Sequence, residues 1–303
     1  MLEVSPALTR NILPRLNPLV IATSVVFLSL SARVSVGAEK LRPGGDQPPL
    51  ASLASGGPPL RVHFINVGYG DAVLIEFPDS SNMLIDAGGG DFAPQLMTYL
   101  QKRDVRRLDA VMITHPHENH FGGLKALTRE MPIGRFLHNG DPQTEEGYAV
   151  LLEHLKEKRI PIDVLRAGRQ VGLSSGAVVM EILHPRGLTG SANDNSVVAW
   201  LKYQKTSILF WADMESAQQE ALIHEFEEIQ EADCIKVPHH GGPLSEAFGR
   251  AFTDKIFIIS TGPNPWGRPY AEDLQKLRGK VYRTDREGTI VVESDGAAVK
   301  VVP

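Results

Sequence analysis

A group of three histidines that follows a short apolar run constrains the fold of this chain more than any other feature. The run, residues 108–114, is almost wholly apolar, which is typical of a buried strand. The next nine residues read His-Pro-His-Glu-Asn-His-Phe-Gly-Gly. Side chains two positions apart in an extended segment point to the same side, so His115 and His117 can converge on one ion. His120 then lies at the start of the following turn or helix and can face back towards the same cleft.

Three imidazoles within six residues at a strand end indicate a metal site, because a neutral imidazole nitrogen is a ligand for zinc and other divalent metals. Gly122 and Gly123 would let the backbone pack closely against this site. The alternative, a surface run of histidines, does not account for the buried strand before the group or the glycines after it. Cys234 is the single cysteine, which excludes an intramolecular disulfide and a cysteine-rich zinc site. Histidine and carboxylate side chains must therefore hold any metal.

Residues 1–38 are predicted to be a signal peptide rather than part of the fold. Arg10 and Arg15 precede an apolar run over residues 19–30, and small residues follow as far as Ala38. The run is shorter than the roughly 20 residues of a membrane span, and an uncleaved N-terminal anchor is the alternative. Both interpretations predict that the rest of the chain is exported, periplasmic or secreted, with no transmembrane domain beyond this segment.

The rest of the chain divides into a linker and one folded domain. Residues 39–59 are rich in proline and glycine, which disfavour regular structure, and residues 60–303 form the predicted domain. With 42% hydrophobic and 22% charged residues, the composition excludes a mostly disordered chain, a coiled coil and a multi-span membrane protein. Residues 1–38 carry three arginines and one glutamate, so the formal net charge changes from −5 to −7 without them. An acidic protein has no general attraction for nucleic acid, and the sequence has no strong nucleic-acid signature.

The order of the regular elements predicts an α/β (α+β) domain in which two sheets lie between helical layers. Strands are predicted over residues 61–67, 72–77, 82–86, 108–114, 178–183, 197–203, 207–211, 234–237 and 256–260, and near residues 281, 290 and 299. Helices are predicted over residues 94–102, 145–159, 215–229 and 272–278.

The histidine group resembles the His-x-His-x-Asp-His signature of the metallo-β-lactamase fold hydrolases. Further segments resemble the extracytoplasmic hydrolase domain of ComEC/Rec2 competence proteins: residues 66–72, 84–88, 114–117, 193–196, 211–213, 236–241 and 282–288. The resemblance covers residues 61–302 in order. It implies a four-layer αββα sandwich with a metal site along the edge between the sheets, so that residues 60–303 would be a metallo-β-lactamase-like hydrolase domain.

The resemblance also implies a set of metal ligands. It assigns His115 and His117 to a first metal, His120 to a second metal, and Asp213 to a bridging catalytic position. Either His239 or His240, which are adjacent, would complete the second site. His184 could be the third ligand of the first metal. The alternatives are a helix N-cap for Asp213 and structural or loop roles for these three histidines.

Two aspartates are expected to support the ligands rather than bind the metal. Asp86 ends a predicted strand before a glycine-rich turn, and its carboxylate could orient a histidine nitrogen. Asp71 could act in the same way from the first turn, with a plain turn aspartate as the equal alternative.

Asn119 departs from the family signature, which has aspartate at this position. In the family this aspartate ligates the second metal and helps position the attacking hydroxide, so Asn119 occupies a catalytic position. Asparagine offers only a neutral carbonyl oxygen, which implies a weaker second site or a mononuclear enzyme. Glu118 would point to the opposite face of an extended segment and is a poor substitute ligand unless the turn is tight.

These features predict an exported metal-dependent hydrolase that uses a metal-activated hydroxide on a small or polymeric phosphodiester or ester. The cofactor would be one or two divalent ions, with zinc expected and manganese or iron as alternatives. A binding module of the same fold with weak or no turnover is the alternative, and a lactonase or β-lactamase is held in reserve. No P-loop sequence is present.

Overall fold

The computed structural model describes residues 58–142, 146–172 and 176–302. The chain divides into two units, residues 1–48 and 49–303, and all described residues belong to the second. The predicted signal peptide and all but the last two residues of the predicted linker lie outside the described residues. Among the residues that are described, no helix combines the length and apolar character needed to cross a membrane.

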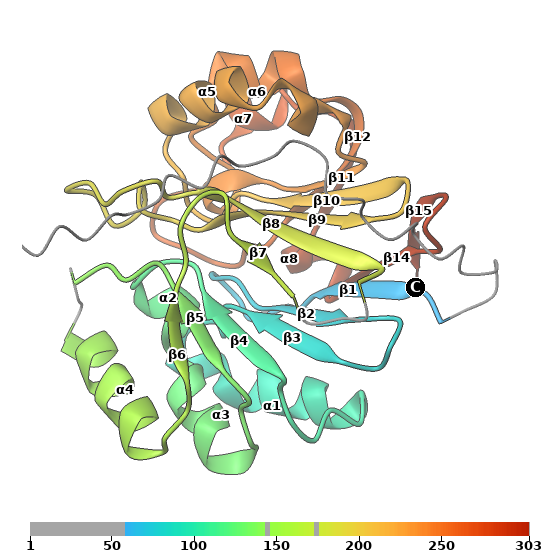
Figure 1. The fold of residues 1–303 in the computed structure, drawn as a ribbon. Helices are drawn as coiled ribbons and strands as arrows, with labels where there is room; N and C mark the ends of the chain where they lie inside the picture. The colour runs from blue at the N-terminus through green and yellow to red at the C-terminus, as the bar shows by residue number, and fades with distance from the viewer. Residues whose placement is uncertain (1–57, 143–145, 173–175, 303) are drawn as a thin grey trace, which may run out of the picture. The chain divides into compact units, whose positions relative to one another are not determined.

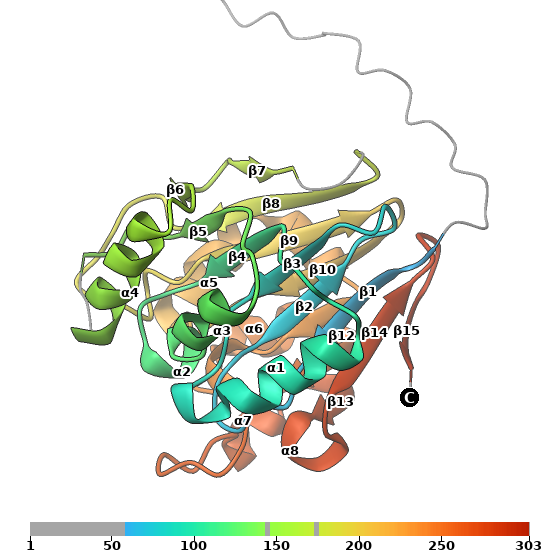
Figure 2. The ribbon, with the colours of Figure 1, turned by 90° about the horizontal axis from the view of Figure 1, so that it is seen from below.

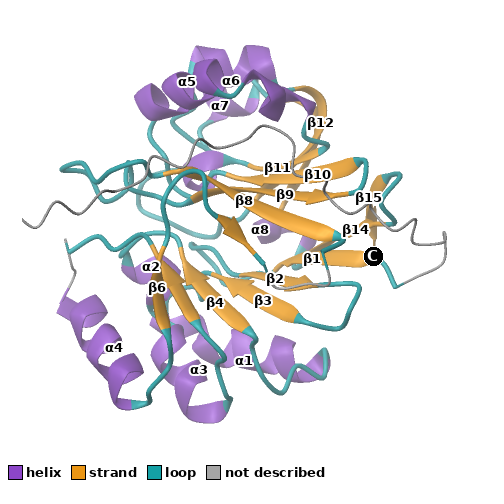
Figure 3. Ribbon diagram, viewed as in Figure 1, coloured by secondary structure: helices purple, strands orange, loops and turns teal. Residues whose placement is uncertain are grey.

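The second unit contains two sheets stacked face to face, with the longer helices on the outer sides (Figures 1 and 3). The first sheet has the order β15 (Val299–Val302), β14 (Ile290–Ser294), β1 (Leu60–Phe64), β2 (Val73–Glu76), β3 (Asn82–Ile85), β4 (Ala110–Ile113), β5 (Phe136–His138) and β6 (Ile162–Val164). The second has the order β13 (Arg278–Arg283), β12 (Thr253–Ile259), β11 (Cys234–Lys236), β10 (Thr206–Phe210), β9 (Val198–Tyr203), β8 (Val178–His184) and β7 (Gln170–Val171). Strands β3 to β6 run parallel, as do β10 to β13.

The period-two pattern of the strands divides their side chains between two faces. In β4, Ala110 and Met112 pack between the sheets, while Val111 and Ile113 pack under the outer helices. Both faces of β4 are covered, which explains why its sequence is apolar throughout. The predicted αββα sandwich is therefore confirmed.

Helices cover the outer face of each sheet, as the two perpendicular views show (Figures 1 and 2). On the first sheet lie α1 (Ala93–Lys102), α3 (Leu124–Glu130) and α4 (Glu146–Glu157). On the second lie α5 (Ser216–Glu225), α6 (Glu246–Ala251) and α7 (Ala271–Leu274). The short elements are α2 (Glu118–Phe121), α8 (Thr284–Glu287) and the 3₁₀ turns η1 (Gly90–Phe92), η2 (Glu227–Glu231) and η3 (Pro238–His240).

Two predicted helices are shorter than the sequence pattern indicates. The helix predicted over residues 215–229 ends at Glu225, and η2 follows Phe226. The break falls in an acidic run, and negative charge is unfavourable at a helix C-terminus. The helix predicted over residues 272–278 ends at Leu274, because β13 begins at Arg278 and pairs with β12.

The Glu76 carboxylate is expected to contribute to stability above pH 4.5. Its oxygens lie 3.1 Å from His63 Nε2 and 2.8 Å from Arg103 Nη2. Burial alone would raise the pKa of Glu76, but the hydrogen bonds from His63 and Arg103 outweigh it and lower the pKa to about 2. A carboxyl group whose pKa is lower in the folded than in the unfolded chain stabilises the fold at pH values above its unfolded pKa. This contribution is lost as the pH falls towards 2.

Glu76→Gln is therefore expected to lower the free energy of unfolding by about 1–2 kcal/mol at pH 7. Between pH 4.5 and 2, the free energy of unfolding of this variant should decrease less than that of the natural chain. Urea denaturation at a series of pH values measures both effects. The exposed glutamate of α3, Glu130, provides the control variant Glu130→Gln. An unchanged pH profile in Glu76→Gln would show that the carboxylate makes no net contribution.

Candidate metal centre

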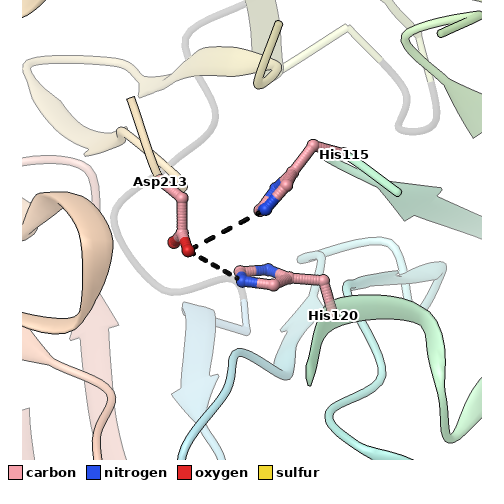
Figure 4. Close-up of side chains that lie close together, drawn as sticks. All are labelled: His115, His120 and Asp213. Atoms are coloured by element: carbon pink, nitrogen blue, oxygen red, sulfur yellow. Dashed lines mark hydrogen bonds and ion pairs between the residues drawn. The ribbon is translucent and has the colours of Figure 1, made fainter. Parts of the chain in front are cut away.

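The predicted ligands come from the carboxyl ends of strands in both sheets. His115 follows β4 of the first sheet, whereas Asp213 follows β10 and His239 follows β11 of the second. The carboxyl ends of parallel strands are the usual place for a ligand site in such folds. The side chains of His115, His120 and Asp213 point towards one another across the two sheets (Figure 4).

Four imidazoles surround one oxygen of Asp213. The distances from Asp213 Oδ2 to the Nε2 atoms are 3.2 Å for His120, 3.3 Å for His240, 3.6 Å for His239 and 3.8 Å for His115. Metal–nitrogen distances of about 2.0–2.1 Å place two ligand atoms of a tetrahedral site roughly 3.3 Å apart. The spacing of these atoms thus fits ligands of a shared metal site.

His117 approaches the same centre from the first sheet. Its Nδ1 lies 2.9 Å from His115 Nε2, so these two nitrogens converge as the sequence interpretation expected. Three sets of three potential ligand atoms lie within 4.8 Å of one another: His115, His120 and Asp213; Asp71, Asp86 and His120; and Asp71, Asp213 and His240.

The charges at the centre favour a cation. Burial alone would lower the pKa of His120, but Asp213 and Asp86 raise it to about 10. Burial and His120 hold the pKa of His115 well below its usual value. The buried polar atoms that have no hydrogen-bond partner among the residues described include three from this group of side chains: Asp71 Oδ1, Asp213 Oδ1 and His239 Nδ1. A group of buried carboxylate and imidazole atoms with unused lone pairs fits a divalent metal.

Hydrogen bonds outside the centre orient two of the histidines. His120 Nδ1 lies 2.8 Å from Asp86 Oδ2, and Asp86 also accepts hydrogen bonds from Thr114. His240 Nδ1 donates to the Ser260 carbonyl oxygen at 2.9 Å, which leaves the Nε2 lone pair facing the centre. The contact of Asp86 with His120 is the one expected of a residue that orients a ligand.

His184 lies apart from the three ligand sets. Its Nδ1 donates to the Ser196 carbonyl oxygen at 3.0 Å, and none of the sets found among the described residues contains it. His117 and His239 are also outside these sets, but their nitrogens lie 2.9 Å from His115 Nε2 and 3.6 Å from Asp213 Oδ2. The N-cap alternative for Asp213 is wrong, because Glu215 occupies the N-cap of α5. Two residues separate Asp213 from the start of that helix, which leaves its carboxylate at the centre.

Asn119 contacts a candidate ligand through its amide. Its Nδ2 lies 3.0 Å from His240 Nε2, the atom that would face a metal. Glu118 begins α2 rather than lying in an extended segment, and its Oε1 accepts a hydrogen bond from the Gly90 backbone at 2.7 Å. An added Cβ at Gly123 would collide with the carbonyl oxygen of Ala87, so the predicted close packing by this glycine is confirmed.

Lys236 is a residue of the centre that the sequence interpretation missed. Its ammonium group forms an ion pair with Asp71 Oδ2, donates to the Ala212 carbonyl oxygen at 3.2 Å, and lies 3.9 Å from Asp213 Oδ1. The available signal was a charged residue in a predicted buried strand. Asp71 therefore pairs with Lys236, and its oxygens remain 3.8 Å from the nearest nitrogens of His120 and His240.

A cavity of about 470 Å³ opens beside the centre. It is lined by Tyr69, His117, Glu118, Asn119, Asn193, Asp213, Glu215, His239, Trp266 and Arg268. Candidate metal ligands line this cavity together with other polar side chains that could contact a substrate.

Residues 65–265 match the family model described as the metallo-beta-lactamase superfamily. ComE operon protein 3 of Bacillus subtilis (strain 168) is 26% identical over 254 residues, covering 76% of this chain and 32% of that protein. Competence protein ComA of Neisseria gonorrhoeae is 24% identical over 233 residues, covering 74% of this chain and 31% of that protein. The chain thus spans about a third of the length of these curated relatives. The predicted resemblance to competence proteins is confirmed.

Solved structures share the fold at low sequence identity. The metallo-beta-lactamase fold protein YhfI from Bacillus subtilis superimposes with a TM-score of 0.54 at 14% identity, over 78% of this chain and all of that one. CmlA, a diiron beta-hydroxylase from Streptomyces venezuelae, gives a TM-score of 0.53 at 16% identity, over 78% of this chain and 54% of that one. These similarities confirm the predicted fold.

Proposed function

The chain belongs to the metallo-beta-lactamase superfamily, and from this we propose that it is an exported metal-dependent hydrolase of phosphodiester or ester bonds. The observation that carries the proposal is the convergence of four imidazole Nε2 atoms on Asp213 Oδ2 within 3.8 Å. Export rests on the sequence of residues 1–38, and a phosphodiester substrate rests on the resemblance to competence proteins. Zinc is the expected metal, with manganese or iron as alternatives.

Each ligand has a proposed role at the centre. His115 and His117 would hold a first ion, His120 and one or both of His239 and His240 a second, with Asp213 shared between them. A bound divalent ion supplies a Lewis acid and a hydroxide at neutral pH. Asp86 fixes the ring of His120, and the Ser260 carbonyl fixes that of His240, so that both present Nε2 to the centre. We assign no ligand role to His184.

Asn119 favours a second candidate function, a binding module with weak or no turnover. Because His240 Nδ1 donates to Ser260, His240 Nε2 can accept a hydrogen bond from the Asn119 amide. This bond competes with a metal for the same lone pair. An aspartate here would instead add a negative ligand, so the second site of the natural chain is expected to be the weaker one.

The hydrolase is tested by metal content and by turnover of bis(p-nitrophenyl) phosphate. We expect at least one equivalent of zinc, manganese or iron per chain and a rate that EDTA abolishes and added metal restores. His115→Ala is expected to lower the rate more than tenfold by removing a ligand. A purified protein with less than one equivalent of metal would contradict the proposal. Parallel assays with an ester, a lactone and a β-lactam distinguish the other reaction classes.

Asn119→Asp separates the hydrolase from the binding module. We expect this variant to raise the metal content towards two equivalents and to increase the rate. Equal background rates in the natural chain, His115→Ala and Asn119→Asp would favour the binding module.

A further inference from the structure

One wall of the cavity beside the metal centre is aromatic and cationic. The rings of Tyr69 and Trp266 lie 4.8 Å apart, tilted by 30°, and the Tyr69 ring lies 4.3 Å from that of His240. Arg268 Nη1 donates to the Tyr69 hydroxyl at 2.8 Å. Tyr69 thus connects a candidate metal ligand to Trp266 and Arg268, and these three residues are called the aromatic wall below.

The loop that presents this wall is built around one asparagine. The Asn264 amide donates to the carbonyl oxygens of Gly262 and Arg268 at 2.9 and 2.7 Å. Its Oδ1 accepts from the backbone of Trp266 and Arg268 at 3.2 and 3.0 Å. The loop lies between β12 and α7 and protrudes in orange at the lower edge of Figure 2. These bonds hold Trp266 in place although 56% of its surface is exposed.

The wall supplies two kinds of contact that the rest of the cavity lacks. Arg268 is the one lysine or arginine among the residues that line the cavity in the described part of the chain. Its Nε is buried without a hydrogen-bond partner among those residues, so the guanidinium has donor capacity left. A guanidinium recognises phosphate oxygens, and an exposed indole offers a face on which a flat ring can stack. The acidic residues of the cavity offer neither contact.

We propose that Trp266 and Arg268 determine specificity, so that the site prefers phosphodiesters whose retained alcohol carries a flat aromatic ring, such as a nucleoside. Arg268 holds a non-bridging phosphate oxygen, and the ring stacks on Trp266. Tyr69 positions Arg268 through its hydroxyl. This inference rests on the proposed phosphodiesterase activity and adds the substrate class to it.

Two matched diesters isolate the ring: benzyl p-nitrophenyl phosphate and cyclohexylmethyl p-nitrophenyl phosphate. Both release p-nitrophenolate and have alcohols of similar size. The metal-loaded protein is expected to prefer the benzyl diester in kcat/KM by at least about fivefold. Trp266→Leu should reduce this preference to less than about twofold. Arg268→Met should raise KM for both diesters about tenfold, and Arg268→Lys should restore part of the loss. The exposed Val150 of α4 provides the control Val150→Ala, which should keep the natural preference.

Binding of benzylphosphonate and cyclohexylmethylphosphonate, measured by calorimetry, separates this inference from the proposed activity. Neither compound can be hydrolysed at its C–P bond. Tighter binding of the benzyl compound that is lost in Trp266→Leu supports the wall even in a protein without turnover, in which case the proposed activity fails. Turnover of both diesters with the same benzyl preference in the natural chain and Trp266→Leu would contradict the proposed role of the aromatic wall in specificity. The proposed phosphodiesterase activity would then still stand.

Discussion

Asp213→Ala is expected to remove most of the bound metal and to lower kcat/KM for a phosphodiester by at least about 100-fold. Asp213 is the carboxylate whose Oδ2 lies within 3.8 Å of four imidazole nitrogens. Its buried charge offsets the charge of a divalent ion, and the metal contribution to such a reaction is worth several kcal/mol. Each 1.36 kcal/mol corresponds to a tenfold change in rate.

The measurement combines elemental analysis, kinetics and thermal unfolding. Asp213→Asn keeps the size of the side chain and removes only its charge, so it remains informative if the alanine variant does not fold. Asp233 precedes β11, at the end away from the centre, and accepts a hydrogen bond from the Ser207 backbone at 2.8 Å. Asp233→Asn is therefore the matched control, with metal content unchanged. Full metal content in both Asp213 variants would show that this carboxylate is not a ligand.

The sequence was most informative where strands end. His115 was predicted from the apolar run before it, which marks a strand that ends at this point, whereas the place of Asp213 was implied by the family resemblance. The choice between His239 and His240 was not predictable. Both residues adopt positive φ, 49° and 58°, in the turn after β11. This backbone conformation is rare for residues other than glycine, and it brings both Nε2 atoms within 3.6 Å of Asp213 Oδ2.

The elements that escaped prediction are short and depend on distant partners. Strands β5 and β6 have three residues each, too few for a period-two pattern to be recognised. Their position follows from parallel pairing with β4 and with each other. The helix predicted through Arg278 failed for the same reason, because pairing with β12 outweighs local helical preference.

Lys236 shows how the partner of a buried charge can be missed from sequence. The strand was predicted over residues 234–237, but no role was assigned to its lysine. The structure places Lys236 within the second sheet with 2% of its surface exposed. Only the folded chain brings Asp71, from the turn after β1, to its ammonium group. A contact between residues so far apart in sequence leaves no local pattern.

Lys236→Met is expected to lower the free energy of unfolding of the metal-free protein by about 3–5 kcal/mol. Methionine fills similar space but leaves the Asp71 carboxylate buried without its partner. The surface pair of Lys156 with Glu153, 2.6 Å apart, provides the control Lys156→Met, which should cost less than about 1 kcal/mol. Urea denaturation at pH 7.5 measures both values.

The double variant Lys236→Met/Asp71→Asn tests whether the cost comes from the unpaired charge. If the Asp71 charge is the cause, neutralising it should recover at least about 1 kcal/mol relative to Lys236→Met alone. If the losses in free energy of unfolding caused by the two substitutions instead add, Lys236 stabilises the protein by packing and by its hydrogen bond to the Ala212 carbonyl oxygen. The ion pair with Asp71 then makes no net contribution. The cycle thus separates a charge that holds the metal centre together from an aliphatic chain that fills space behind it.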